Sequence, residues 1–504
     1  MKNIYILNFI VAMVLFSSCA DLNQDPESSI DKDNFYQTEN DVETAVNGIY
    51  SIFKSEGYLT LYNNVLIYIG DMSTDYARAG RSLNNVHSKE LSNCAVQPTN
   101  DVTNRAWWQS YVGINRANVV IDKLAKNTNL DNSTKERYTN EAKFLRALNY
   151  FNLVRLFGSV PLVIHDGEGE GQPRTPVDEV YAQIVSDFEA ARNLPEEYTG
   201  STGGRPTPEA AVACLSKVYL TWAQTDSEKG KSNRKEFYQK SLDYANHVIN
   251  SGKYKLIEKF IDLFSVDKKN GSEHIFSIQH SNNENYTGHC PFSTGWSDSE
   301  PMLTTTDTIW WSRMDNADQR KEYSWAKTLW NPNTNSYFTY KVPRFRKYID
   351  TINYAKDQFA GRNTNNVYIR YAEILLIKAE VENELNGPTV EAYEAINEVR
   401  RRAYRHFPVT QVSKDDLPNG LTQDEFREKL QRERFDEFIL EGQRWFDLVR
   451  WKILVKTVKP WKPLISERNY LFPIPSDQIT LNPNLTQNWG YSGETTGSPY
   501  SNYK

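Results

Sequence analysis

Apolar residues recur every three or four positions along much of the chain, the period of an α-helix with one buried face. The first such face carries Val42, Val46 and Ile49. Just before it, Thr38 is followed three residues later by Asp41, a pattern that caps the start of a helix. The same spacing predicts helices over residues 108–124, 138–156, 177–191, 211–222, 238–249, 369–385 and 392–399.

The helical period fades in three stretches, over residues 70–104, 158–176 and 253–366. These stretches are rich in Gly, Asn, Ser, Thr, Asp and Pro, which favour turns and loops. The helices between them come in consecutive pairs, although the sequence shows no fixed-period repeat motif. We therefore predict a mainly α fold, with paired helices as a scaffold and a loop-rich, less regular half at about 253–366 that carries the ligand site.

The amino-terminal residues have the pattern of a secretory signal. Lys2 precedes an apolar run over residues 4–16, and two serines then lead to Cys19. A cysteine directly after small residues is similar to a bacterial lipobox, so we expect residues 1–18 to be removed and Cys19 to be lipidated. The alternative is an ordinary signal peptide with an incidental cysteine.

The residues after Cys19 are polar and acidic. Residues 19–31 include Pro26 and suit a flexible, lipid-anchored tether, and residues 32–504 then form the body. Acidic residues behind a lipidated cysteine resemble the surface-export signals of certain Gram-negative lipoproteins. We therefore expect the protein at the outer membrane, facing the cell exterior.

Charge and composition narrow the class of partner. The net charge is −6 and the pI about 5.8, so the overall field does not attract a phosphate backbone, and we expect no nucleic acid partner. The 12 Trp, 30 Tyr and 22 Phe exceed what a core of this length needs. Because the apolar face of a sugar ring stacks on aromatic rings, some of them are candidates for glycan contacts, while most belong to the core.

The sequence shows little sign of enzymatic or metal chemistry. It contains no HExxH, no GxSxG, no phosphate-binding glycine loop and no dinucleotide fingerprint. His274, His280 and His289 lie in a loop-rich segment without ligands at convincing spacing, so we expect neither metal nor cofactor. A disulfide between Cys94 and Cys290 is permitted by an oxidising compartment, but the sequence leaves it open.

Several segments together resemble the SusD-like (RagB/SusD) family of outer-membrane nutrient-binding lipoproteins. The matching segments are Asp33-Asn-Phe-Tyr, Glu141-Ala-Lys-Phe-Leu-Arg-Ala-Leu-Asn-Tyr-Phe, Leu153-Val-Arg-Leu-Phe-Gly-Ser-Val-Pro-Leu-Val, Tyr368-Ile-Arg-Tyr-Ala-Glu-Ile-Leu-Leu, Ile396-Asn-Glu-Val-Arg, Arg432-Glu-Arg-Phe-Asp-Glu-Phe, Glu441-Gly-Gln-Arg-Trp-Phe-Asp-Leu-Val-Arg-Trp, Leu471-Phe-Pro-Ile-Pro and Leu481-Asn-Pro-Asn-Leu-Thr-Gln-Asn. The resemblance implies tetratricopeptide-like helix pairs, non-catalytic capture of oligosaccharide, and docking on a SusC-like TonB-dependent transporter.

The charged residues of these segments suit a scaffold better than a ligand site, because they can pair as partly buried ions between helices. Glu433, Glu437 and Glu441 recur at four-residue steps among arginines and mimic a row of catalytic carboxylates, but a salt-bridged helix face explains them as well. The other charged residues of this kind are Arg146, Arg155, Arg370, Glu373, Arg444, Asp447 and Arg450.

Candidate ligand-binding residues are aromatic or cationic side chains in polar stretches. The family supplies no portable site motif, so these candidates rest on local chemistry. We expect stacking faces at Trp296, Trp330 and Tyr76, hydrogen-bond donors at Arg78 and Arg81, and an outward-facing ring at Trp107 with Trp108 in the core. Trp310 and Trp311 are expected to pack inside the fold.

Three functions are weighed. The first is a glycan-binding lipoprotein that delivers its ligand to a SusC-like transporter and catalyses no reaction. The second keeps the fold and the partner but takes peptide as cargo. The third is a lipid-anchored glycosidase, which paired carboxylates at the right separation would allow and which the missing motifs disfavour.

Overall fold

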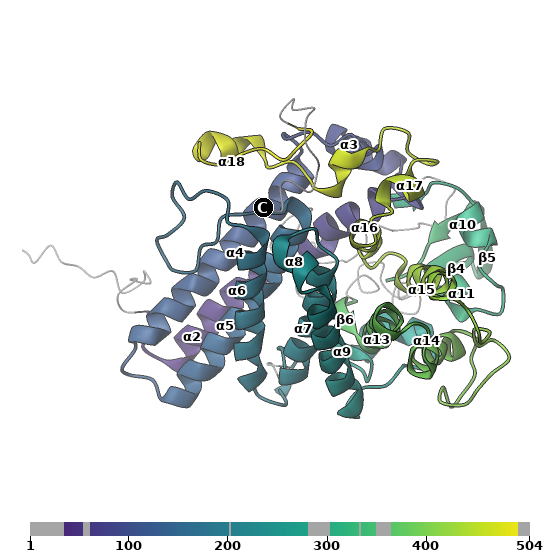
Figure 1. The fold of residues 1–504 in the computed structure, drawn as a ribbon, viewed down its shortest axis with the longest axis horizontal. Helices are drawn as coiled ribbons and strands as arrows, with labels where there is room; N and C mark the ends of the chain where they lie inside the picture. Colours follow the sequence, from purple (N-terminus) through teal and green to yellow (C-terminus); the bar gives the residue numbers. More distant parts are fainter. Residues whose placement is uncertain are drawn as a thin grey trace, which may run out of the picture.

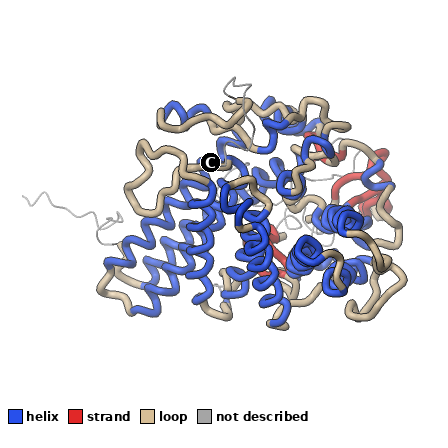
Figure 2. Tube along the Cα trace, in the orientation of Figure 1, coloured by secondary structure: helices blue, strands red, loops and turns tan. Residues whose placement is uncertain are grey.

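The structure is a computed structural model that describes residues 35–53, 61–200, 203–280, 303–331, 334–348 and 364–491. Long helices lie side by side from α2 to α9 and continue into a second group around α13 (Figure 1). Helix dominates and the strands are short and few (Figure 2). The predicted mainly α fold is therefore confirmed.

The long helices form a continuous array in which each packs against the next along the chain. Every helix predicted from the apolar period is present, and the capping box of Thr38 with Asp41 begins the first one. The long helices are α2 (Glu39–Tyr50), α4 (Asp101–Lys126), α5 (Asn132–Phe157), α6 (Val177–Ala190), α7 (Pro208–Ala223), α9 (Arg234–Asn250), α13 (Tyr371–Asn386), α14 (Val390–Ala403) and α15 (Gln423–Phe438).

The less regular half contains three two-stranded antiparallel sheets, which pair β1 with β3, β2 with β6 and β4 with β5. The strands are β1 (Ala77–Ala79), β2 (His274–Ile278), β3 (Leu303–Thr305), β4 (Trp325–Asn331), β5 (Ser336–Phe345) and β6 (Asn366–Arg370). The short α-helices are α3 (Val86–Ser92), α8 (Glu228–Ser232), α10 (Ile309–Ser312), α11 (Gln319–Ser324), α16 (Arg444–Arg450), α17 (Leu454–Val458) and α18 (Ser476–Leu481). The 3-10 and π turns are η1 (Ser51–Phe53), η2 (Leu61–Val65), η3 (Tyr68–Met72), η4 (Arg81–Leu83), η5 (Ala191–Asn193), η7 (Phe260–Phe264), η8 (Val266–Lys268) and η10 (Glu467–Tyr470).

The carboxy-terminal residues close the core over the first helices. The backbone N–H of Phe472 donates to the carbonyl of Leu156 at 2.8 Å. Asn488 is fully buried, and its amide donates to the carbonyls of Phe157 at 3.0 Å and Phe472 at 2.7 Å. One apolar core therefore contains residues from both ends of the described chain.

A largely buried charge cluster joins the second group of helices to the strands. Glu437 lies at its centre and contacts Arg320, Arg370 and Arg402. Burial acts to raise the pKa of Glu437, but the three arginines hold this pKa well below its usual range. The charge cluster consists of Arg320, Lys347, Arg370, Arg400 and Arg402 with Glu273, Asp318, Glu433, Glu437 and Glu441.

The predicted scaffold role of the charged family residues is confirmed. Arg146 makes a bidentate contact with Asp187 at 2.8 Å for both bonds, and Arg444 does the same with Asp75 at 3.1 and 2.7 Å. Arg155 is held differently, with its guanidinium 3.9 Å from the centroid of the Phe151 ring. Among the residues that the structure describes, no helix is long and apolar enough to cross a membrane.

Candidate functional site

Two chain segments far apart in sequence meet in the small sheet of β1 and β3. Arg78 lies opposite Thr304 in the antiparallel register. The Thr306 N–H donates to the carbonyl of Tyr76 at 2.9 Å, and the Thr306 hydroxyl donates to the carbonyl of Asp75 at 2.6 Å. The sheet thus fixes the backbone on which the candidate Arg78 stands.

The candidates Arg78 and Arg81 lie at the solvent side of this sheet. Arg78 is half-buried and donates to the carbonyl of Ala79 at 3.1 Å, while Arg81 is exposed at the start of η4. Trp296 lies outside the described residues, and β3 begins seven residues after it in the sequence. Because β3, Ala77 and Leu83 are buried, solvent is reached here by Arg78, Ala79 and Arg81, and we name the surface of these three residues the ribbon surface.

Tyr76 does not provide the expected stacking face. Its side chain is fully buried, with ring centroids 5.3 Å from Phe435 and 5.8 Å from Phe345 in edge-on contacts. Its hydroxyl accepts a hydrogen bond from the Leu440 N–H at 2.9 Å. The prediction is wrong because residues far along the chain cover a ring that its polar sequence neighbours made look exposed.

Trp330 lies on a β-hairpin rather than in a loop. It pairs across the strands with Tyr337, and the two rings meet edge-on at 5.2 Å. Trp330 is 41% exposed and Tyr337 is 71% exposed. Sequence reasoning missed Tyr337, although turn residues between two aromatic stretches are a hairpin signal that would have pointed to it. The base of the hairpin rests on the core, because Phe345 contacts Tyr76 and β5 packs against β3.

The expected orientation of the adjacent tryptophans in α4 is reversed in the structure. Trp107 is 3% exposed and packs against Tyr111 and Phe157, each at 5.1 Å, whereas Trp108 is 51% exposed. The reason is that the i, i+4 pair on the buried face is Trp107 with Tyr111. Trp107 still lines a hollow of about 380 Å³ beside α18, where Leu481 is exposed, but this hollow is not part of the ribbon surface.

A second hollow, of about 340 Å³, is lined by residues of α10, α15, α16 and α17. Its volume is on the scale of ligand pockets, roughly 300 Å³ and above. We name it the arginine pocket. It is lined by Asp75, Trp310, Arg313, Gln431, Arg432, Phe435, Arg444, Ile453, Thr457 and Trp461. As expected, Trp310 is buried, and Trp311 is packed against the core.

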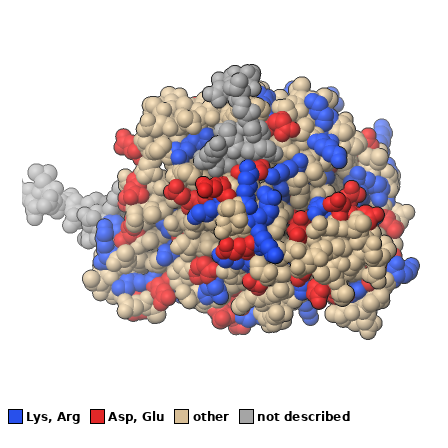
Figure 3. Space-filling model, in the orientation of Figure 1, with Lys and Arg blue, Asp and Glu red and all other residues tan. Residues whose placement is uncertain are grey.

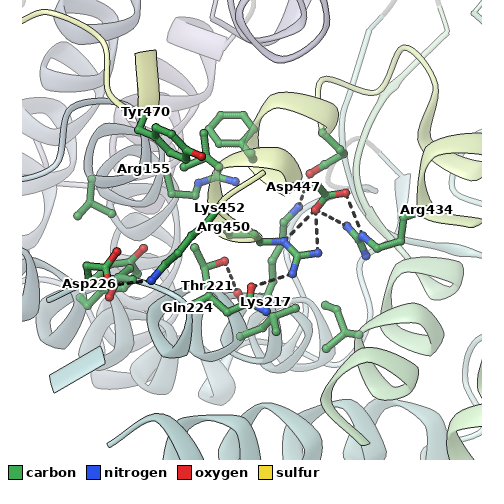
Figure 4. Close-up of a pocket in the computed structure, with 18 of the residues that line it drawn as sticks. Arg155, Lys217, Thr221, Gln224, Asp226, Arg434, Asp447, Arg450, Lys452 and Tyr470 are labelled. Carbon is green, nitrogen blue, oxygen red and sulfur yellow. Dashed lines mark hydrogen bonds and ion pairs between the residues drawn. The ribbon is translucent and has the colours of Figure 1, made fainter. Parts of the chain in front are cut away.

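A further, small cavity lined by charged residues lies between α7 and α16 (Figure 4). Asp447 points toward Arg434 and Arg450 there, at 3.0 and 2.8 Å (Figure 4). Burial acts to raise the pKa of Asp447, but these arginines hold this pKa below its usual value. The cavity measures about 50 Å³, and because a water occupies about 30 Å³ it has room for one or two waters rather than a sugar ring.

The acidic residues suspected of mimicking a catalytic row are engaged in structural contacts. Glu433 contacts Arg320 at 2.6 Å and Arg400 at 2.8 Å, and Glu441 contacts Lys347 at 2.9 Å. The expected salt bridges are confirmed, and Glu433 and Glu437 lie on α15 as predicted, whereas Glu441 lies beyond the end of this helix because the chain turns at Leu440.

The described residues contain no group of three or more His, Cys, Asp or Glu placed to hold a metal ion. His274 and His280 are buried, and His289 lies outside the described residues. Cys94 is a buried free thiol that donates to the Ser73 carbonyl at 3.4 Å, and Cys290 also lies outside the described residues.

The structure is thus an array of packed helices that carries an exposed aromatic pair on a hairpin. The model of the SusD family matches residues 218–463, and a second family model, described as starch-binding and associating with the outer membrane, matches residues 15–220. The chain belongs to the SusD-like (RagB/SusD) family.

Individual relatives cover nearly the whole chain. SusD-like protein P2 of Formosa agariphila is 29% identical over 96% of this chain and 99% of its own length. The starch-binding protein SusD of Bacteroides thetaiotaomicron is 23% identical over 80% of this chain and 81% of its own. The crystal structure of a SusD superfamily protein from Parabacteroides distasonis has a TM-score of 0.76 at 25% identity, covering 90% of this chain and 99% of that one.

Proposed function

We propose that this protein is a cell-surface lipoprotein that binds oligosaccharide or polysaccharide, catalyses no reaction, and passes its ligand to a SusC-like TonB-dependent transporter. Membership of a family whose model is described as starch-binding and associating with the outer membrane supports the ligand class. The structural observation that carries the proposal is the exposed pair of Trp330 and Tyr337 on a hairpin whose base contacts the sheet of Arg78.

In this proposal, aromatic rings stack on the sugar and arginines donate hydrogen bonds to it. The exposed rings of Trp330 and Tyr337 offer apolar faces to sugar rings, while the guanidinium groups of Arg78 and Arg81 donate to hydroxyls. Trp296 stays a predicted further contact. Each stacking contact contributes little once the ordering of the ligand is subtracted, so binding to single sugars is weak and release to a transporter is easy.

Anchorage through Cys19 and the tether over residues 19–31 belong to the same proposal. Both lie outside the described residues and rest on the signal pattern of the sequence. A lipid-anchored body on a flexible tether stays near a membrane transporter, which raises its effective concentration there. The transporter partner is the one that the family resemblance implies.

The test is affinity electrophoresis and calorimetry of the mature chain, starting after Cys19, against a panel of soluble polysaccharides. We expect retardation by one glycan with no new reducing ends. Release of reducing ends would instead establish a glycosidase. If no glycan binds but a peptide panel does, the cargo is peptide and the proposed ligand class is wrong.

A further inference from the structure

The arginine pocket is connected to the sheet of β1 and β3 through two of its lining residues. Asp75 lines the pocket and comes two residues before β1 in the sequence. Trp310 forms another wall, and its indole N–H donates to the hydroxyl of Thr306, the residue after β3, at 2.9 Å. The pocket is therefore lined by the residue two positions before β1 and is joined by a hydrogen bond to the residue that follows β3.

Three guanidinium groups face this hollow, and two of them have carboxylate partners. Arg444 is paired with Asp75 by two bonds at 3.1 and 2.7 Å, and Arg432 is paired with Asp436 at 2.6 Å. Arg313 is exposed, with its guanidinium 4.0 Å from the ring centroid of Trp310. Within the described residues no carboxylate forms an ion pair with Arg313.

The guanidinium of Arg313 is partly buried against aromatic rings and lies among charges of both signs. Burial against the aromatic rings, and then the neighbouring Arg432, lower the pKa of Arg313 to about 10. Asp75 and Asp436 raise the pKa of Arg313, but their carboxylates are already ion-paired with Arg444 and Arg432. An anion placed in the pocket would balance the third guanidinium.

The aromatic wall gives the pocket a shape as well as a charge. The Trp310 ring packs at 5.1 Å from Trp461 and at 5.3 Å from Phe435, so it is held rigidly. Trp461 is only partly buried and presents its ring beside the arginines. A flat apolar face next to a guanidinium fork fits a sugar ring that carries an oxyanion, because the ring stacks and the oxyanion accepts charge-assisted hydrogen bonds.

The overall field does not supply this preference. The net charge of the chain is −6, and acidic and basic side chains are interspersed on the face drawn in Figure 3. Long-range attraction of a polyanion is therefore weak, and selection of an acidic ligand has to come from local contacts.

From this geometry we infer that the arginine pocket binds an oxyanion substituent, a carboxylate or a sulfate ester, on a sugar of a glycan lying across the ribbon surface, which rests on the proposed glycan-binding function. Arg313 is the principal contact and Trp461 the stacking ring. An oxyanion gains a charge-assisted hydrogen bond to Arg313 that a neutral sugar cannot make, so we expect the pocket to favour an acidic glycan over a neutral one.

The experiment compares three oligosaccharides of equal length by calorimetry on the mature chain: an oligogalacturonate, a sulfated galactan fragment and an unsulfated galactan fragment. We expect an acidic fragment to bind at least about tenfold more tightly than the neutral one, and the two acidic arms distinguish carboxylate from sulfate. Arg313→Gln should remove that preference, so that acidic and neutral fragments bind with about equal affinity. Arg313→Lys should restore part of it.

Arg105→Gln is the control, because Arg105 is a half-buried arginine on α4 that pairs with Asp101 and does not line the pocket. Equal affinity for acidic and neutral fragments, or an acidic preference that survives Arg313→Gln, overturns the inference and leaves the proposed function standing. Free galacturonate and inorganic sulfate are titrated with the same variants. If these ions bind in a way that depends on Arg313 but no glycan binds, the oxyanion site is supported and the proposed function is wrong. No binding in any arm overturns both.

Discussion

Glu437 shows at the scale of a single residue why the family's charged positions are structural. Its carboxylate is fully buried and contacts three arginines from three different parts of the fold. A buried charge network tolerates the loss of one member poorly, because the remaining charges lose their partner without regaining water.

Glu437→Gln is therefore expected to lower the free energy of unfolding by about 3–5 kcal/mol, the range for breaking a buried ion pair. Urea denaturation of the mature chain measures the change. Glu428→Gln on the same helix is the control, because Glu428 is exposed and surface changes stay within about 0.5 kcal/mol. A loss for Glu437→Gln no larger than that of the control would contradict the structural role.

Asp71 carries a prediction about pH. Its carboxylate is buried and accepts a hydrogen bond from the Gly442 N–H at 2.9 Å. Burial raises the pKa of Asp71 to about 7, against the opposing effects of the Tyr76 hydroxyl, Gly442 and Lys347. Because the folded state holds this proton more tightly than the unfolded chain, Asp71 makes the protein lose stability as pH rises from about 4 to about 7.

Asp71→Asn removes this titration while keeping the acceptor oxygen. We expect the stability of the variant relative to the native chain to rise by on the order of 2–4 kcal/mol between pH 4 and pH 8. Urea denaturation at a series of pH values measures the difference. A difference that stays flat over this range would show that Asp71 ionises normally in the folded protein.

At the scale of elements, the hairpin of β4 and β5 carries the exposed aromatic pair. Trp330→Ala with Tyr337→Ala is expected to weaken glycan binding about tenfold or more, because both stacking faces are lost. Affinity electrophoresis measures the binding, and the melting temperature should hardly change since both rings are exposed. Trp108→Ala is the control, an exposed tryptophan on α4. Unchanged binding in the double variant would move the site away from the hairpin.

The elements also show how far the sequence predicts the fold. Helices were predictable because the spacing of their buried residues, such as Val42, Val46 and Ile49, is visible within a short stretch of sequence. The sheet of β1 and β3 was not, since Arg78 meets Thr304 across more than two hundred residues and neither strand exceeds three residues.

The candidate site was predictable only in part, for the same physical reason. Arg78 and Trp330 lie on two elements that β3 and β5 bring together, and both stand in polar sequence that suggested exposure. Tyr76 and Trp107 failed because burial depends on which distant segment packs on a ring, and the local pattern contains no information about Phe435 or Phe157.

At the scale of the whole molecule, the two ends of the described chain share one core. The buried Asn488 links the end of α5 to the segment of Phe472, and its side-chain oxygen accepts from Arg174 at 2.7 Å. Three hydrogen bonds thus depend on one amide.

Asn488→Ala is expected to lower the free energy of unfolding by roughly 2–4 kcal/mol, because it removes three interior hydrogen bonds at once. Thermal unfolding followed by circular dichroism and by tryptophan fluorescence should show a single transition at one lowered temperature. Control measurements on Asn484→Ala, at an exposed position nearby, should show little change. Separate transitions for the two probes would show that the carboxy-terminal segment unfolds independently.

The charge cluster around Glu437 has a consequence for how such proteins diversify. The three arginines that contact Glu437 come from α11, β6 and α14, and none of them belongs to the hairpin tip of Trp330 and Tyr337. If the tip binds the ligand as proposed, mutations there change recognition without removing a partner from the charge cluster. Evolution or protein engineering can then replace the hairpin tip, and with it the glycan that is taken up, while the stability of the protein is preserved.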